Sequence, residues 1–295
     1  MEPHLPKAGS LPTAEFESYR QTLDRVLGLT ESLTASDPAR ETAVPSPAEL
    51  QERLRSGIPM LVPERIHVRP GYAVEFLDGL GEILREVNSA DLPEAGRRYL
   101  AAYSSGRVEA DSFLRATLHD DTRYFAELAR SNELDLAFLV FAAVYLGRPV
   151  RGPLAARSRE QVDLASWSGG NCPCCGHWPA HSRLDTKGKR FLWCNCCATE
   201  WRFPRLRCPY CGNDDQDTLH HFEVEANTGR RVDACGACRR YLKVKLAASH
   251  ARDFDRENLL TFPLDIAAVQ EGYVLEIHAP IRSERRPDSR KGGLS

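Results

Sequence analysis

The sequence has no excess of either charge and no apolar segment of membrane length. Its 39 basic and 41 acidic residues give a net charge of -2, so no global field draws it to nucleic acid or to an anionic lipid surface. The longest apolar run, 136–146, is about half of the roughly 20 residues that a membrane-spanning helix needs. These absences argue against a membrane protein and against a purely electrostatic nucleic-acid binder.

The N-terminal residues lack a basic segment followed by an apolar one, which is the pattern of a secretory signal. Cysteine is absent outside the segment from Cys172 to Cys238, which holds all ten. We therefore expect a protein of the reducing cytoplasm. Its 295 residues, 42% of them hydrophobic, suffice for one large domain or two modest ones with a real core.

The first half of the chain shows helical periodicity. Apolar residues at three- and four-residue steps predict a helix over residues 13–28, and 35–45 reads as a linker. Ser46 is expected to cap a second helix, with Pro47 in its first turn and Glu49 closing a capping box. Further helices are predicted at about 72–87, 94–104, 109–130, 133–146 and 154–165. The segment 133–146 is apolar on nearly every side, so we expect it at the centre of a helical domain.

The pattern changes near Trp167 to turn residues, paired cysteines and short alternating strands. Four C-x-x-C pairs occur in two tandem modules, each with a hairpin between its pairs. Such a turn presents two thiolates to one metal ion, and the hairpin brings the second turn opposite the first. Gly176 and Gly212 directly follow two of the pairs, where a positive φ lets the chain fold back. The predicted ligands of two metal ions, each held by four thiolates, are Cys172, Cys175, Cys194 and Cys197 in the first module and Cys208, Cys211, Cys235 and Cys238 in the second.

Both modules are typical of rubredoxin-type zinc ribbons. Residues 190–193 are a predicted strand of the first module, and 219–225 and 230–233 of the second. Residues 242–246 alternate so that Lys243 and Lys245 would lie on a solvated strand face. The spacing does not choose iron over zinc, because both ions accept four thiolates.

Six nearby side chains remain outside this scheme. Cys174 and Cys196 could be a redox pair, alternative ligands or small apolar fillers, and we interpret them as fillers because a free cysteine behaves as a small hydrophobe. Histidines could complete a site, but four sulfurs already satisfy each metal. The histidines left out are His177, His181, His220 and His221.

The predicted fold class is α+β multidomain: an N-terminal all-α domain, two tandem rubredoxin-like zinc-ribbon modules and a C-terminal helix over about 256–273, in which Pro263 marks a kink or break. The predicted boundaries are 1–12 (disordered N-terminus), 13–165 (helical domain), 166–206 (first ribbon), 207–250 (second ribbon), 251–281 (C-terminal helix and extension) and 282–295 (disordered tail).

The cysteine region resembles the FdhE family of formate dehydrogenase accessory proteins. The residues that carry the resemblance are Trp167-x-x-Gly-x-Cys-Pro-x-Cys-Gly-x-x-Pro179, Cys194-x-x-Cys-x-Thr-Glu-Trp201, Cys208-x-x-Cys211, Cys235-x-x-Cys-x-x-Tyr-Leu-Lys243, Leu264-Asp265 and Glu271-Gly272-Tyr273. The match extends over about 167–273, and the helical half agrees in architecture and size only. Cys174 and Cys196 stand where the family usually has apolar residues, and Pro263 interrupts its C-terminal helix.

This resemblance implies a cytoplasmic, non-enzymatic protein that is needed for active formate dehydrogenase. It would bind the catalytic subunit of that molybdenum or tungsten enzyme during maturation, and the four C-x-x-C motifs would carry rubredoxin-like iron. The residues themselves predict no catalytic group and no organic cofactor, since no phosphate loop or open zinc site is visible. Homo-oligomerisation is left open.

Two rival functions remain at this stage. One is an iron redox protein, or thiol exchange at Cys174 and Cys196. The other is a nucleic-acid-binding ribbon, because residues 200–245 hold nine lysines and arginines against seven acidic residues. That near balance disfavours nucleic acid unless the arginines cluster on one face.

Overall fold

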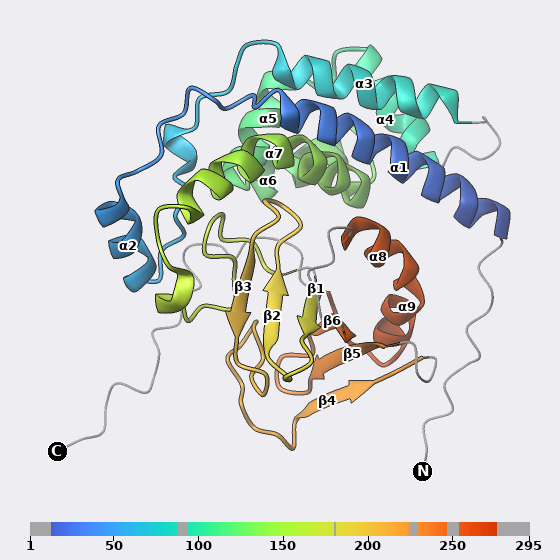
Figure 1. The fold of residues 1–295 in the computed structure, drawn as a ribbon. Coiled ribbons are helices and arrows are strands. Elements are labelled where there is room, and N and C mark those ends of the chain that lie inside the picture. Colours follow the sequence, from blue (N-terminus) through green and yellow to red (C-terminus); the bar gives the residue numbers. More distant parts are fainter. Residues whose placement is uncertain (1–12, 88–93, 180, 225–228, 247–253, 276–295) are drawn as a thin grey trace.

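The computed structural model describes residues 13–87, 94–179, 181–224, 229–246 and 254–275. A layer of helices arches over a sheet, and two short helices cover one face of that sheet (Figure 1). The elements of the helical layer are α1 (Thr13–Ala35), α2 (Pro47–Arg55), the 3₁₀ turn η1 (Pro63–Arg65), α3 (Tyr72–Glu86), α4 (Glu94–Ser104), α5 (Ala110–His119), α6 (Thr122–Asn132), α7 (Leu136–Arg159) and the 3₁₀ turn η2 (Leu164–Ser166).

The helical layer is built around α7, which packs against α1, α3, α5 and α6. Leu146 and Val150 of α7 are fully buried, and the hydroxyl of Tyr72 donates to the carbonyl of Leu146 at 2.5 Å. The predicted start of α2 is confirmed, since Ser46 Oγ accepts the Glu49 N–H at 3.3 Å. The apolar segment around 136–146 thus lies in the core, as its composition predicts.

The single helix predicted over 109–130 is wrong. The structure has two helices, α5 and α6, which meet at adjacent aspartates. Asp120 ends α5 in the left-handed region at φ 54°, and Asp121 begins α6 by accepting the Tyr124 N–H at 3.0 Å. Aspartate favours both positions because its short side chain bonds to nearby backbone.

The separate helices predicted at 133–146 and 154–165 are also wrong, because α7 runs without interruption through Pro149 and Pro153. A proline inside a helix removes a backbone hydrogen bond and costs about 3 kcal/mol. The helix continues because its residues on both sides of the prolines are buried, Leu146 before them and Leu154 after them. Tertiary packing therefore outweighs the local penalty.

The sheet has six strands in the order β3-β2-β1-β6-β5-β4. Strands β1 to β3 belong to the first module and β4 to β6 to the second, and each set is antiparallel. Parallel pairing of β1 with β6, in which His181 lies opposite Lys243, joins the two modules into one sheet. The strands are β1 (His181–Leu184), β2 (Arg190–Trp193), β3 (Glu200–Phe203), β4 (Leu219–Phe222), β5 (Arg230–Cys235) and β6 (Tyr241–Leu246).

The C-terminal helical region consists of two helices, α8 (Phe254–Leu260) and α9 (Phe262–Gln270), rather than one. The break predicted at Pro263 is confirmed, because this residue lies in the first turn of α9. The α9 helix packs against β5 and β6, with Leu264 and Ala268 buried. The sheet face under α8 and α9 is therefore not solvated.

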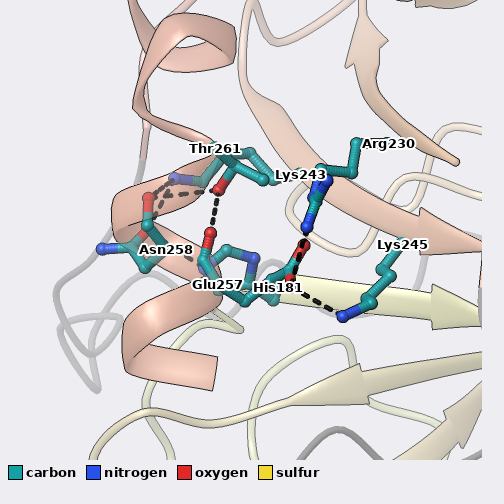
Figure 2. A network of polar contacts seen from close by, with 7 residues as sticks. All are labelled: His181, Arg230, Lys243, Lys245, Glu257, Asn258 and Thr261. Carbon is teal, nitrogen blue, oxygen red and sulfur yellow. Dashed lines mark hydrogen bonds and ion pairs between the residues drawn. The ribbon is translucent and has the colours of Figure 1, made fainter. Parts of the chain in front are cut away.

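This cover makes the predicted solvated position of Lys243 wrong. Its side chain is only 1% exposed, and its Nζ lies 2.6 Å from Asp265 Oδ2 and donates to Asn258 Oδ1 at 2.5 Å. Beside it, Glu257 of α8 accepts hydrogen bonds from Arg230 and Lys245 (Figure 2). A layer of paired charges thus fixes α8 and α9 to the strands.

Among the described residues, no helix is both long enough and apolar enough to span a bilayer. The predicted segments 1–12 and 282–295 lie outside the described residues. The domain limits stay a prediction, while the mixed α+β class with a helical N-terminal region, two four-cysteine modules and C-terminal helices is confirmed.

Candidate metal centres

Each of the four C-x-x-C pairs lies in the same type of turn. The N–H of Cys172 donates to the carbonyl of His177, five residues on, and the N–H of Gly176 donates back to the carbonyl of Cys172. The turns that begin at the first cysteine of the other three pairs repeat both bonds, at 2.7 to 3.0 Å. The two modules thus fold their cysteine turns alike.

The turn requires a left-handed residue directly after the second cysteine. Gly176 has φ 87° and Gly212 has φ 77°, as the sequence predicts. The equivalent residues of the other two turns are Ala198 at φ 55° and Arg239 at φ 58°. A side chain is strained in this region, so the surrounding bonds must hold these two residues there.

The turns gather the eight predicted cysteines into two groups of four. Cluster 1 contains Cys172, Cys175, Cys194 and Cys197, and cluster 2 contains Cys208, Cys211, Cys235 and Cys238; within each, all sulfurs lie within 4.8 Å of one another.

The sulfur spacing fits one tetrahedral ion per cluster. In cluster 1, the Sγ atoms of Cys172 and Cys197 are 3.5 Å apart, and in cluster 2 those of Cys208 and Cys238 are 3.7 Å apart. Four sulfurs at the usual zinc–sulfur distance of about 2.3 Å would be about 3.8 Å apart. Both clusters could therefore hold a metal ion.

The ionisation of the thiols points the same way. Burial raises the pKa of Cys172 and Cys194 well above the usual value for cysteine, whereas the hydrogen bond from Cys208 lowers the pKa of Cys238 to about 5. Without a cation, the buried thiols of Cys172 and Cys194 thus resist ionisation. A bound metal cation would stabilise the four thiolates together.

The two clusters differ in their exposure to solvent. In cluster 1 three cysteines are buried and Cys175 is half-buried, while in cluster 2 Cys211 is exposed and Cys238 half-buried. Each cluster also has a polar neighbour near one sulfur: the Thr199 hydroxyl lies 3.1 Å from Cys197 Sγ, and the Asn213 amide donates to Cys235 Sγ at 3.6 Å. Such contacts orient metal ligands.

Cluster 1 lies against the helical layer. The backbone N–H groups of Met60 and Leu61 donate to the carbonyls of Pro173 and Cys174, both at 2.8 Å. The first cysteine turn is thereby bonded to the loop that follows α2. A structural change at cluster 1 would therefore be transmitted to the helical layer through these two backbone hydrogen bonds.

Two arginines of α7 make a second connection, which the sequence did not reveal. Arg148 donates to the carbonyl of Asn195, inside the second cysteine turn, and is ion-paired with Asp255 of α8 at 2.6 Å. Arg151 is ion-paired with Asp120 at 2.7 Å, and the same carboxylate lies 3.0 Å from His177 Nε2. The available signal was two arginines three residues apart that directly follow the apolar run 136–146, which indicates buried partners.

The side chains set aside in the sequence lie outside the two groups of sulfurs. Cys174 and Cys196 are fully buried, which accords with apolar filling, and this role stays a prediction. His177 contacts Asp120, and His181 lies 3.0 Å from the amide oxygen of Asn258. No histidine joins either cluster among the described residues.

Comparison with known proteins finds a family-model match that covers cluster 1 and not cluster 2. Residues 171–205 match the family model described as FdhE, central domain. The chain is 31% identical over 113 residues to an FdhE homolog of Aquifex aeolicus, covering 37% of this chain and 40% of that one. It is 35% identical over 123 residues to an FdhE homolog of Stutzerimonas stutzeri, covering 40% and 37%. These alignments thus span 40% or less of the relatives' length.

The fold is also similar to that of the FdhE protein from Pseudomonas aeruginosa, known from its crystal structure. The TM-score is 0.51 at 20% sequence identity, over 94% of this chain and 97% of that one. At this identity the likeness concerns the fold alone. Together, the family model, the relatives and the shared fold confirm the resemblance to the FdhE family that the cysteine motifs predict.

Proposed function

We propose that this protein is a cytoplasmic accessory factor that binds the catalytic subunit of formate dehydrogenase and is needed for its activity. The observation that supports this proposal most is the presence of a compact sulfur tetrad in a stretch that matches a known family model. The four cysteine turns form two compact sulfur tetrads, and the first of them lies within the stretch that matches the FdhE central domain.

In this proposal each cluster of four cysteines binds one iron or zinc ion. Zinc would supply structural cross-linking alone, whereas iron would add a one-electron couple. The protein's own contribution is to hold four sulfurs around each ion and to bond the turns of cluster 1 to the helical layer. Each ion would be closed by four thiolates, which leaves no position for substrate and supports a non-catalytic role.

The nucleic-acid alternative loses much of its basis. Of the nine basic residues counted between 200 and 245, four form internal ion pairs in the described structure: Arg230 and Lys245 with Glu257, Arg231 with Asp233 and Lys243 with Asp265. Those side chains are occupied inside the protein.

The test combines metal analysis with capture of the client. The tagged protein, purified without added metal, should contain two ions per chain and should retain the formate dehydrogenase catalytic subunit from cells that produce it. A visible spectrum would identify iron, since zinc gives none. A Cys172→Ser/Cys208→Ser variant should lose both ions and should not restore formate dehydrogenase activity in a strain that lacks its own accessory factor.

The buried but unassigned Cys174 offers the control, and Cys174→Ser should keep both ions and the activity. If the metal-loaded wild-type protein fails to retain the subunit, or if the double variant restores full activity, the proposed function is wrong.

A further inference from the structure

A large groove lies at one edge of the sheet, beside β3. Strand β3 pairs with β2 on one side only, and beside it a groove of about 1150 Å³ runs between the sheet and the end of the helical layer at η2. An edge strand directs alternate N–H and C=O groups away from the sheet, where they can pair with a further strand. The groove thus combines space with unused strand-pairing capacity.

The wall of this edge groove is aromatic. Trp167, Trp193 and Trp201 line it, together with Phe191 and Phe203. Tryptophan and other aromatics are enriched where proteins bind one another, because they bury a large area at a small entropic cost. Three of the four tryptophans of the chain therefore border one groove, each with no more than 9% of its surface exposed.

The rim of the groove is basic. Lys189, Arg202 and Arg205 line it and are exposed, and none of the three forms an ion pair among the described residues. The carboxylate of Glu200 is bound by Arg183 through two hydrogen bonds of 2.7 and 2.8 Å, so it does not neutralise them. The one exposed acidic residue of the lining is Asp163.

From these observations we infer that the groove beside β3 binds an extended, acidic segment of a partner protein, which adds a strand to the sheet. Alternate side chains of an added strand point to opposite faces, so apolar residues would contact the tryptophans while acidic ones meet the basic rim. A strand edge pairs with a polypeptide and not with a nucleic acid, which favours a protein partner. The inference deepens the proposed function, on which it rests, by naming the surface that contacts the client.

A direct test uses a defined probe and the full-length protein. The probe is a capped peptide of about ten residues, enough to span a strand, that alternates glutamate with valine. Its binding should change the tryptophan emission, because three of the four indoles line the groove. The same peptide with lysine in place of glutamate should bind at least tenfold more weakly, and so should the glutamate peptide N-methylated at alternate residues, which cannot pair with the edge.

The variant Arg202→Glu should weaken binding of the glutamate peptide at least fivefold. Arg123→Glu is the matched control, because Arg123 is 87% exposed on α6, outside the groove lining, and it should leave binding unchanged. Equal affinity for the glutamate and lysine peptides, or undiminished binding of the N-methylated peptide, would overturn the inference. So would binding of a single-stranded oligothymidylate that depends on Arg202 while the peptide does not bind.

The final comparison uses the client itself. If wild-type protein retains the formate dehydrogenase catalytic subunit and Arg202→Glu loses most of that retention while Arg123→Glu does not, the groove is the contact surface. If both variants retain the subunit equally, the groove inference fails and the proposed function stands. If the wild-type protein does not retain the subunit, the proposed function fails. The peptide measurements then show separately whether the groove binds an acidic strand.

Discussion

Lys243 and Asp265 form an ion pair between strand β6 and helix α9, with Nζ 2.6 Å from Oδ2 and the lysine side chain almost completely buried. The tyrosine next but one to the lysine, Tyr241, donates to the other oxygen of the same carboxylate at 2.8 Å. One acidic residue of α9 thus satisfies two side chains of the last strand. The Lys243–Asp265 pair is one of several ion pairs that attach the C-terminal helices, beside those of Glu257 and Asp255.

Replacing Asp265 by asparagine should destabilise the protein by about 3 kcal/mol, since it leaves a lysine buried without its counter-charge. Lys243→Met should cost less, because the remaining carboxylate is 20% exposed and can be hydrated. The combined variant should be clearly more stable than the sum of the two losses indicates. Urea unfolding followed by circular dichroism measures all three, and strictly additive losses would contradict a coupled pair.

Acid should weaken the protein through His181. Burial, aided by the charge of Lys243, lowers the pKa of this histidine to about 3, whereas an unfolded histidine has a pKa of about 6.5. Between these values the unfolded chain binds the extra proton, so the stabilisation is complete above about pH 6.5 and is lost as the pH falls toward 3.

The free energy of unfolding of wild-type protein should therefore fall by about 1 kcal/mol more than that of His181→Gln between pH 7.5 and 5.5. The difference between the two proteins isolates this group, because acid displaces metal from both alike. Nuclear magnetic resonance of the imidazole gives an independent reading: a His181 ring that becomes protonated near pH 6.5 would refute the expectation.

A chelator should remove metal in two phases. Cluster 2 should lose its ion first, because Cys211 is exposed, while three of the four cysteines of cluster 1 are buried. Metal content measured against time should pause near one ion per chain. Cys211→Ser should abolish the fast phase, and release of both ions at a single rate would show that exposure does not govern access.

The left-handed residues of the cysteine turns allow a paired test. Gly176→Ala should destabilise the first turn by about 1–2 kcal/mol, both because φ is 87° and because the added Cβ would lie 3.1 Å from Pro59 Cγ. Ala198→Gly, at the equivalent position of the next turn, should be neutral or stabilising by up to about 1 kcal/mol. Thermal unfolding of the metal-loaded proteins measures the stability of each variant. Equal losses of stability in both variants would contradict the role of backbone strain.

Local features of this fold were readable from the sequence, since their causes lie within a few residues. The C-x-x-C turns predicted both sulfur groups, and Ser46 marked the start of α2. The break between α5 and α6 was equally local, because Asp120 and Asp121 are typical capping residues, but periodicity alone concealed it.

The remaining features depend on residues far apart in the chain. Alternation around Lys243 favoured a solvated face, and only the packing of α9 with Asp265 shows why a lysine is buried there. Pairing of His181 with Lys243 across the two modules has no local signal, because each module alone has the pattern of a complete hairpin unit. Arg148 likewise acquires its role only when Asn195 and Asp255 come together.

The parallel pairing of β1 with β6 also sets an order for assembly during synthesis. Strand β1 emerges from the ribosome with its own hairpin, but its second neighbour is the last strand of the sheet. Until that strand is translated, the nascent first module presents an open β edge, even if its sulfurs have already captured an ion. The six-stranded sheet can close only after β6, which ends at Leu246, has been made, so a product interrupted before it would be exposed to aggregation through that edge.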